Sequence, residues 1–371
     1  MDYSTWTRAW DSGKWRICQG ESRLCRLPLM ADPASIPNFT FPLGEQSPRT
    51  LQGGIAAEAS VVEFPISKNI AGVFMKLIPG GLRELHWHAN AAEWAYMIDG
   101  EAQVTVFDPS GAWETLDFAP GDIWYFPKGH GHSIQGMGGK ECTFILVFDN
   151  GAFSEFATFS LTDWLAHTPP DIVSKNLHLS SEDVAQLPRG EVYIATGPSP
   201  AMVSDHRSSD DTPPLTHKFG LRSQAPRTFE GGTMRIVSET EFPISTTMTG
   251  ALLTLRPGAF RAMHWHPNAD EWQYIVKGNA RLSVFASSGM ASTVDMKAGD
   301  VGYIPMGFGH AIENVGDGEM EMIIVLNNGQ YQEISASAWL ASQPTQLLAT
   351  NLGVSEEIVN RIPKTSKLIR D

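Results

Sequence analysis

The feature that most constrains this chain is an internal repeat that carries potential metal ligands. Two histidines, a glutamate and a later histidine occur twice in the same order, as His86, His88, Glu93 and His132 and again as His264, His266, Glu271 and His310. All four pairs lie 178 positions apart, since 264 − 86 and 310 − 132 both give 178. This constant spacing predicts two related domains that each hold one ion.

The residue types in each set indicate the chemistry of the expected site. Successive side chains of a β-strand point to opposite faces, so the two histidines of each His-Trp-His segment point the same way. Three neutral imidazoles and one carboxylate leave open positions on a six-coordinate divalent ion, which suits manganese or iron. A single His-x-His pair is equally compatible with histidines that only complete a core or a sheet edge. The recurrence of all four residues at one offset favours the metal site.

The sequence between these residues is typical of β-structure. Short apolar segments such as AGVFMKLIP, EWAYMID and DIWYFP are bounded by Pro, Gly and Asp. Such segments predict many short antiparallel strands joined by turns. Each copy contains a complete strand set, so we predict an all-β protein with short helices, built from two tandem, jelly-roll-like β-barrel domains.

A change in the repeat spacing indicates where the two domains differ. The offset of 178 holds as far as Gly151, whereas Trp164 matches Trp339 at an offset of 175. The first domain therefore has three extra residues between Gly151 and Trp164. The segments PPDIVSKNL and SSEDVAQLP follow with helical spacing, and Ser180 and its counterpart Ser355 are predicted N-caps. We predict an N-terminal arm at 1–40, a first domain at 41–190 with the longer segment at 152–163, an inter-domain crossing at 191–225 and a second domain at 226–371.

Composition excludes several classes of function. The 371 residues carry a formal net charge of −14 and contain only three cysteines. An acidic surface without a basic stripe repels phosphate and argues against nucleic acid. Three cysteines are too few for a disulfide framework. No segment approaches the ~20 apolar residues of a membrane span, and the N-terminal residues lack the apolar core of a secretory signal. We therefore expect a soluble, cytoplasmic protein that binds neither nucleic acid nor membrane.

The spacing of the ligands resembles the two-part cupin signature. The first copy reads Gly80-x5-His86-x-His88-x4-Glu93-x6-Gly100, followed by Gly121-x5-Pro127-x-Gly129-x2-His132. The second copy, over 258–278 and 299–314, matches more fully, because Gly136 replaces the final asparagine of the signature in the first copy. The segments RELHWH, EWAYMI, DIWYFP, HSIQG and TDWLAHTP make residues 40–371 similar to the oxalate decarboxylases, which are two-domain cupins, or bicupins.

The resemblance implies a function and roles for individual residues. It implies two Mn(II) ions per chain, dioxygen as co-catalyst, oxalate as the substrate, formate and CO2 as the products, and a homo-oligomer built as a trimer or hexamer. Arg83 and Arg261 are similar to the family's arginine that holds the substrate at the metal, and a guanidinium fork suits a carboxylate. Arg83 precedes His86 by three positions, an odd spacing on a strand, but a bend or bulge can turn Arg83 toward the ion. Glu155 matches the family's lid glutamate, which takes and returns a proton, so 152–163 is the expected lid.

The two copies are not expected to be equivalent. The second-domain segment QYQEISASA has no obvious counterpart of Glu155, and Ile324 stands where some relatives carry an acidic residue. We therefore expect catalysis in the first domain and a structural or electron-storing metal in the second.

Three alternative functions remain open at this stage. An oxalate oxidase, which yields CO2 and hydrogen peroxide, differs in the proton delivery of the lid, and Phe156-Ala157 departs from the usual, more polar lid. A different metal-dependent bicupin dioxygenase or isomerase would replace Arg83 with an apolar pocket. A storage-type bicupin would have lost ligands, whereas all eight are present here.

Overall fold

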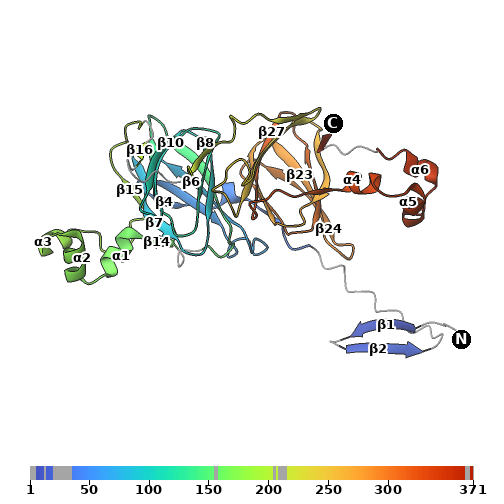
Figure 1. Cartoon of the computed structure of the whole chain (residues 1–371), viewed down its shortest axis with the longest axis horizontal. Helices are drawn as coiled ribbons and strands as arrows, with labels where there is room; N and C mark the ends of the chain where they lie inside the picture. Colours follow the sequence, from blue (N-terminus) through green and yellow to red (C-terminus); the bar gives the residue numbers. More distant parts are fainter. Residues whose placement is uncertain are drawn as a thin grey trace.

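The chain forms two β-domains that lie side by side, with a group of helices projecting from each end (Figure 1). The computed structural model describes residues 6–11, 14–19, 36–153, 158–203, 206–207, 215–363 and 368–370, and gives side chains from residue 36 onward except at 206–207. A separate hairpin is formed by β1 (Trp6–Asp11) and β2 (Lys14–Gln19), which pair antiparallel.

The first domain consists of two antiparallel sheets. One has the strand order β14-β7-β12-β9-β10-β16, with β15 also beside β7, and the other has the order β17-β11-β8-β13-β6-β5-β4. These strands are β4 (Arg49–Leu51), β5 (Gly54–Ala59), β6 (Ala71–Leu77), β7 (Gly81–His88), β8 (Glu93–Asp99), β9 (Glu101–Phe107), β10 (Trp113–Phe118), β11 (Asp122–Phe126), β12 (Gly131–Met137), β13 (Cys142–Phe148), β14 (Thr158–Ser160), β15 (Ile194–Thr196), β16 (His206–Arg207) and β17 (Lys218–Gly220).

The second domain repeats this arrangement. Its sheets have the orders β18-β19-β20-β27-β22-β25-β3 and β24-β23-β26-β21-β28, with β29 also beside β21. The strands are β3 (Thr40–Phe41), β18 (Arg227–Phe229), β19 (Gly232–Val237), β20 (Thr249–Leu255), β21 (Phe260–Trp265), β22 (Glu271–Lys277), β23 (Asn279–Phe285), β24 (Ala291–Lys297), β25 (Val301–Ile304), β26 (Gly309–Asn314), β27 (Met320–Leu326), β28 (Ile334–Ser335) and β29 (Ile369–Arg370). The predicted all-β class with two tandem jelly-roll domains is confirmed, but each domain has two separate sheets rather than one closed barrel.

Each domain ends in short helices, as the sequence predicted. They are α1 (Leu161–His167), α2 (Pro170–Leu177) and α3 (Ser181–Val184) in the first domain, and α4 (Ala336–Ala341), α5 (Thr345–Leu352) and α6 (Glu356–Asn360) in the second. The 3-10 turn η1 spans Leu43–Glu45. Ser180 and Ser355 are the N-caps of α3 and α6, because their side chains accept a hydrogen bond from the backbone three residues later. Within the described part of the chain, every helix is too short or too polar to cross a membrane.

The domains exchange one strand in each direction. Strand β3 precedes the first domain in sequence but pairs with β25 of the second, where Phe41 lies opposite Val301. Strand β17 precedes the second domain but pairs with β11 of the first, where Phe219 lies opposite Ile123. The segment predicted as a crossing therefore contributes β15, β16 and β17 to the sheets of the first domain.

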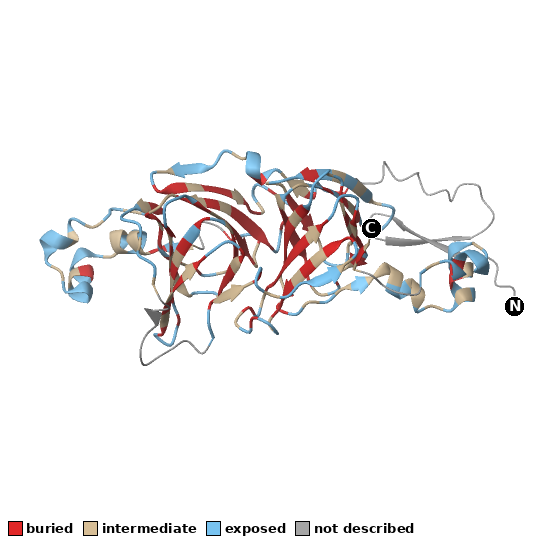
Figure 2. Cartoon of the chain, turned by 90° about the horizontal axis from the view of Figure 1, so that it is seen from above, coloured by how far each residue is buried: buried red, intermediate tan, exposed pale blue. Residues whose placement is uncertain are grey.

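Buried strands of the two domains face each other (Figure 2) and share one core, which contains two tryptophan–glycine contacts. Trp94 and Trp272 are both fully buried. A Cβ atom on Gly250 would lie 2.3 Å from Cζ2 of Trp94, and one on Gly72 would lie 2.1 Å from Cζ2 of Trp272. Each indole thus fills a space that only a glycine of the other domain leaves open. The two contacts are equivalent under the 178-residue repeat.

We expect Gly72→Ala and Gly250→Ala each to lower the free energy of unfolding by about 1–3 kcal/mol, the usual effect of overpacking a core. The matched control is Gly139→Ala, because a Cβ atom at Gly139 would meet no other atom within 4 Å. Urea unfolding followed by tryptophan fluorescence provides the measurement. Equal stability of the three variants would show that the indoles can move at no cost.

Candidate metal centres

A β-bulge brings Arg83 to the same side of β7 as the histidines. His132 pairs with His86, and the next pair joins Ile134 to Arg83. Between these two pairs β7 advances by three residues and β12 by two, so β7 has one extra residue. The bulge turns Leu85 outward, where it is 52% exposed, and leaves Arg83 buried. Strand β21 has the same irregularity between Arg261 and His264. The bend that the sequence spacing required is therefore present in both domains.

The eight predicted ligands come together in two buried sets. His86, His88, Glu93 and His132 form one set and His264, His266, Glu271 and His310 form the other, and within each set the ligand atoms lie within 4.8 Å of one another. In the first set β7 carries both histidines of the His-x-His pair, and β8 and β12 carry the glutamate and the third histidine. In the second set His264 lies on β21 and His266 directly after it, with the glutamate on β22 and the third histidine on β26.

Backbone carbonyls orient the imidazoles of the first set. The Nδ1 atoms of His86 and His132 lie 2.6 and 2.9 Å from the carbonyl oxygens of Glu84 and His130. A carbonyl oxygen only accepts hydrogen bonds, so Nδ1 carries the proton and Nε2 directs its lone pair to the centre of the set. Nδ1 of His88 lies 2.9 Å from the hydroxyl of Thr158. The Nε2 atoms of His86 and His132 are thus available to bind a metal, and Nε2 of His88 lies 3.1 Å from Oε2 of the predicted ligand Glu93.

The second set follows the same rule with carbonyl partners alone. Nδ1 of His264 lies 2.7 Å from the Ala262 carbonyl oxygen, and Nδ1 of His310 lies 3.1 Å from that of Phe308. Nδ1 of His266 lies 2.6 Å from the carbonyl oxygen of Gln332. The segment that carries Gln332 therefore helps to fix the tautomer of a predicted ligand.

The electrostatics of the first set favour neutral imidazoles beside an ionised carboxylate. Burial, followed by the charge of Arg83, lowers the pKa of His86 well below its ordinary value. Burial lowers the pKa of His88 to about 4, although Glu93 opposes the shift. Burial by itself would raise the pKa of Glu93, but His132 and His88 hold it below its usual value. At neutral pH His86 and His88 thus offer lone pairs beside the negative charge of Glu93.

These donors fit a divalent metal ion. Nε2 of His132, Nε2 of His310 and Oε2 of Glu271 are buried and have no hydrogen-bond partner among the described residues. Nε2 of His310 lies only 3.2 Å from Oε2 of Glu271, and each atom directs lone pairs at the other. Leaving buried polar atoms without a partner costs ~1–3 kcal/mol each. A cation at the centre removes that cost, and a set of three imidazoles and a carboxylate suits manganese or iron.

The two sets differ in the group that holds the glutamate. Nε1 of Trp124 donates to Oε1 of Glu93 over 2.8 Å, whereas Nε2 of Gln273 donates to Oε1 of Glu271 over 2.6 Å. The donors come from different strands, and the position equivalent to Trp124 is Gly302. A Cβ atom on Gly302 would lie 2.7 Å from Oε1 of Gln273. The glycine is therefore what gives the glutamine its space.

We expect Gln273→Leu to weaken metal binding at the second set by roughly 10–100-fold, the usual effect of losing a hydrogen bond to a ligand, and to leave the first set unchanged. Competition with a chelator, analysed as two classes of site, measures both affinities. Trp124→Phe is the matched variant and should weaken only the first set. Equal weakening of both sets by either variant would contradict this assignment.

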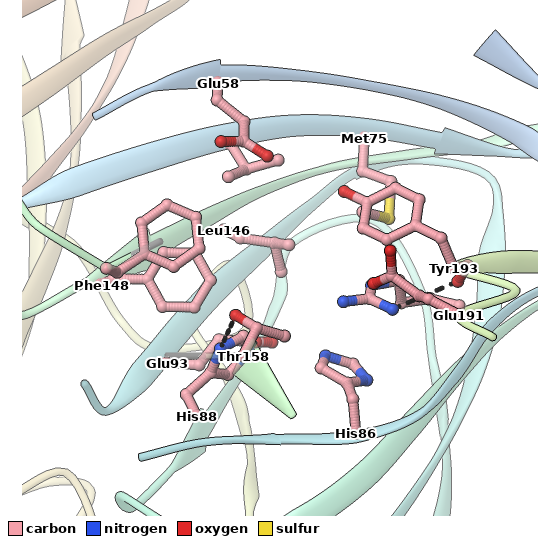
Figure 3. A pocket seen from close by; sticks show the side chains of 13 residues that line it. Glu58, Met75, His86, His88, Glu93, Leu146, Phe148, Thr158, Glu191 and Tyr193 are labelled. Atoms are coloured by element: carbon pink, nitrogen blue, oxygen red, sulfur yellow. Dashed lines mark hydrogen bonds and ion pairs between the residues drawn. The ribbon is translucent and has the colours of Figure 1, made fainter. Parts of the chain in front are cut away.

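A cavity adjoins the first set, and residues beyond the predicted domain limit line part of it (Figure 3). Nη1 of Arg83 donates to the Tyr193 carbonyl oxygen over 3.2 Å, and its guanidinium lies 4.1 Å from the centre of the Tyr193 ring. The guanidinium of Arg49 lies 3.9 Å from the same ring and forms an ion pair with Glu191 at 3.3 Å. Glu191 and Glu58 also line the cavity. Arg83 is thus held in a fixed plane beside the ligands.

Backbone geometry at Tyr193 shows how tightly this segment is held. Its φ of 65° is unfavourable for a residue with a side chain. Its N–H donates to Oε1 of Glu84 over 2.6 Å, and that contact helps to maintain the conformation. We did not predict a role for Tyr193 or Glu191. The signal that would have revealed this segment is the 175 offset, which continues to Tyr193-Ile194 and Leu368-Ile369.

The predicted lid glutamate, Glu155, lies outside the described residues, as do the other residues of 154–157. The residues on either side of this segment are next to the first set. The Phe153 ring stacks on Phe148 at 3.8 Å, and its centre lies 6.1 Å from that of His88. Thr158 contacts His88 directly. Phe153 and Thr158, which flank this segment, therefore both lie beside the candidate metal site.

In the second domain a carboxylate contacts the equivalent arginine. Nη1 of Arg261 donates to the Leu368 carbonyl oxygen over 3.1 Å, which matches the contact of Arg83 with Tyr193. Nη2 of Arg261 contacts the carboxylate of Glu333 and lies 3.3 Å from the Tyr331 hydroxyl. Glu333 was not among the predicted site residues, although it follows Glu155 by 178 positions.

The fold and the two ligand sets define a two-domain, metal-binding cupin. The cupin family model matches residues 41–185 and 219–360. Oxalate decarboxylase OxdC of Bacillus subtilis is 41% identical over 340 residues, which cover 91% of this chain and 88% of the relative. A probable oxalate decarboxylase of Arthroderma benhamiae is 33% identical over 343 residues, covering 91% of this chain and 84% of the relative.

Solved structures agree with these relatives. The structure of the B. subtilis oxalate decarboxylase at pH 4.6 has a TM-score of 0.86 and 40% identity, and covers 93% of this chain and 90% of its own. A structure from work on the Mn(II) centres of that enzyme has a TM-score of 0.84 and 40% identity. The match covers 91% of this chain and 89% of the chain in that structure. The chain belongs to the oxalate decarboxylase family of two-domain cupins.

Proposed function

We propose that this protein decarboxylates oxalate to formate and CO2 in its first domain, with Mn(II) at both ligand sets and dioxygen as co-catalyst. The observation that carries the proposal is that a buried arginine and a complete His3Glu set line one cavity. Two relatives named oxalate decarboxylase and a third named probable oxalate decarboxylase support this substrate. The Mn(II) centres of the B. subtilis enzyme support this metal.

Arg83 is the residue proposed to bind oxalate. A guanidinium offers parallel N–H donors that match a carboxylate, and charge-assisted bonds of this kind are strong in a buried site. Tyr193 fixes the guanidinium through its carbonyl and its ring, so little freedom is lost when an anion binds. Burial lowers the pKa of Arg83, while the neighbouring Tyr193 and Glu191 oppose the shift. The side chain still carries its charge at neutral pH.

Bound manganese and dioxygen supply the one-electron and Lewis-acid chemistry that weakens the C–C bond of oxalate. Arg83 holds the remaining carboxylate in place as CO2 leaves. Glu155 takes a proton from hydrogen oxalate and returns it to the carbon of the remaining fragment, which becomes formate. Hydrogen oxalate gives formate and CO2 without net oxidation, so dioxygen is not consumed. Segment 152–163 is the proposed lid that excludes water during the reaction.

An oxalate oxidase is the second candidate. It converts oxalate, dioxygen and two protons into two CO2 and hydrogen peroxide, so it needs no proton at carbon. Phe156-Ala157 favours this alternative because the lid segment is less polar than in the family pattern. The three decarboxylase relatives favour the first candidate.

We further propose a homo-oligomer, either a trimer or a hexamer. The helices at each end project from the β-domains (Figure 1) and carry exposed apolar side chains, among them Ile172, Leu177, Leu347, Leu352 and Ile358. Such side chains are suited to contact another copy of the chain. Light scattering would give the number of copies. A cytoplasmic location stays a prediction from the N-terminal sequence.

We expect Arg83→Lys to lower the rate of oxalate decarboxylation by roughly 10²-fold, because lysine keeps the charge but loses the fixed fork that positions a carboxylate. Metal content should not change. Arg261→Lys is the matched variant and should leave the rate near that of the wild type. An equal loss in both variants would show that catalysis is not confined to the first domain.

We expect Glu155→Gln to lower formate production by roughly 10²–10⁴-fold, the usual contribution of a general acid–base group. Glutamine keeps the size of the side chain but cannot transfer the proton, so residual turnover should shift from formate toward peroxide. The measurement is the formate-to-peroxide ratio at equal manganese content. A near-normal rate with an unchanged ratio would remove Glu155 from the mechanism and favour the oxidase.

A further inference from the structure

The second ligand set lies beside a closed arrangement of Arg261, Tyr331 and Glu333. The side chain of Arg261 is 1% exposed and that of Glu333 is 16% exposed, so their ion pair is largely shielded from water. The Tyr331 hydroxyl lies 3.3 Å from Nη2 of Arg261 and donates to Oε2 of Glu333 over 2.5 Å. The carboxylate therefore has a cation on one side and a hydroxyl donor on the other.

This arrangement is next to the metal ligands. The Tyr331 ring lies edge-on to His266, with centres 5.7 Å apart. The carbonyl oxygen of Gln332, between Tyr331 and Glu333, accepts the hydrogen bond from Nδ1 of His266. Burial raises the pKa of Tyr331, so its hydroxyl remains a donor. The predicted metal ligand His266 is held by the backbone of Gln332, whereas Arg261 is held by the side chain of Glu333.

The two domains differ in what contacts the arginine. Arg83 and Arg261 sit at the same bulge and donate through Nη1 to equivalent carbonyl oxygens. Among the described residues, Arg83 has no carboxylate partner at ion-pair distance, and its ring partner is Tyr193. Leu368 occupies the position of Tyr193 in the second domain. The second domain thus lacks the stacked tyrosine, and Glu333 from its own chain binds the guanidinium.

We propose that the second domain contains a binding site for small carboxylates that Glu333 keeps filled from within the chain. The inference rests on the proposed function only in taking the place beside Arg83 as a carboxylate site. A carboxylate attached to the same chain competes at a high effective concentration, so formate, acetate or oxalate does not displace it. Removing the side chain leaves a buried, unpaired guanidinium, and an external carboxylate regains the lost interaction. The wild-type protein accordingly has one carboxylate site per chain.

The test compares three variants of the full-length, manganese-loaded protein. Equilibrium dialysis with labelled formate should give one bound formate per chain for the wild type and two for Glu333→Ala. Glu333→Gln is the control, because glutamine fills the same space, and it should bind one. The double variant Glu333→Ala/Arg261→Lys should bind the second formate roughly 10–100-fold more weakly, the usual effect of losing a charge-assisted hydrogen bond. Acetate should raise the melting temperature of Glu333→Ala more than that of the wild type.

The outcomes separate this proposal from the proposed function. One formate per chain in Glu333→Ala, with both metals retained, would overturn the carboxylate site in the second domain. If Glu333→Ala folds or retains its second metal only when acetate is present, the proposal is supported, and if acetate restores neither, it is overturned. A wild-type chain without decarboxylase activity would refute the proposed function. A gain of one formate in the variant would still identify the second site.

Discussion

The structure depends on a cluster of lone pairs at the centre of each domain. Three imidazole nitrogens and a carboxylate oxygen converge there within 4.8 Å of one another, and a cation at their centre makes such an arrangement favourable. Several features of the fold serve this convergence. Carbonyl oxygens fix the imidazole tautomers, the bulge turns an arginine to the same side, and a tryptophan or glutamine holds the carboxylate. The site is therefore built by the scaffold before any ion enters.

The repeat explains why so much could be predicted from the sequence. The ligands and the strand-rich fold depend on local spacing that the offset of 178 preserves, and the helix N-caps recur at the offset of 175. The bulge was predictable because Arg83 and His86 have the wrong spacing for a regular strand. The roles of Tyr193 and the exchanged strands depend on contacts between distant segments, which periodicity does not encode. Glu333 was missed for a different reason, since the change from 178 to 175 falls beside it and obscures its counterpart.

Differences between the two domains come from paired substitutions on a common framework. Trp124 with Ala95 in the first domain corresponds to Gly302 with Gln273 in the second, and both pairs supply one donor to the ligating glutamate. A single exchange would leave either a clash or a missing hydrogen bond, so the substitutions depend on each other. The repeat thus keeps the positions of the eight predicted ligands while the residues around them differ.

The exchanged strands impose an order on synthesis of the chain at the ribosome. Strand β25 of the second domain pairs with β3, which has already been made when β25 emerges. Strand β11 of the first domain pairs with β17, which is made about a hundred residues later, near Phe219. Until then β11 has an unpaired edge that can join another chain. The nascent first domain therefore passes through a period of exposure that the second domain avoids, and either domain expressed alone retains an open edge.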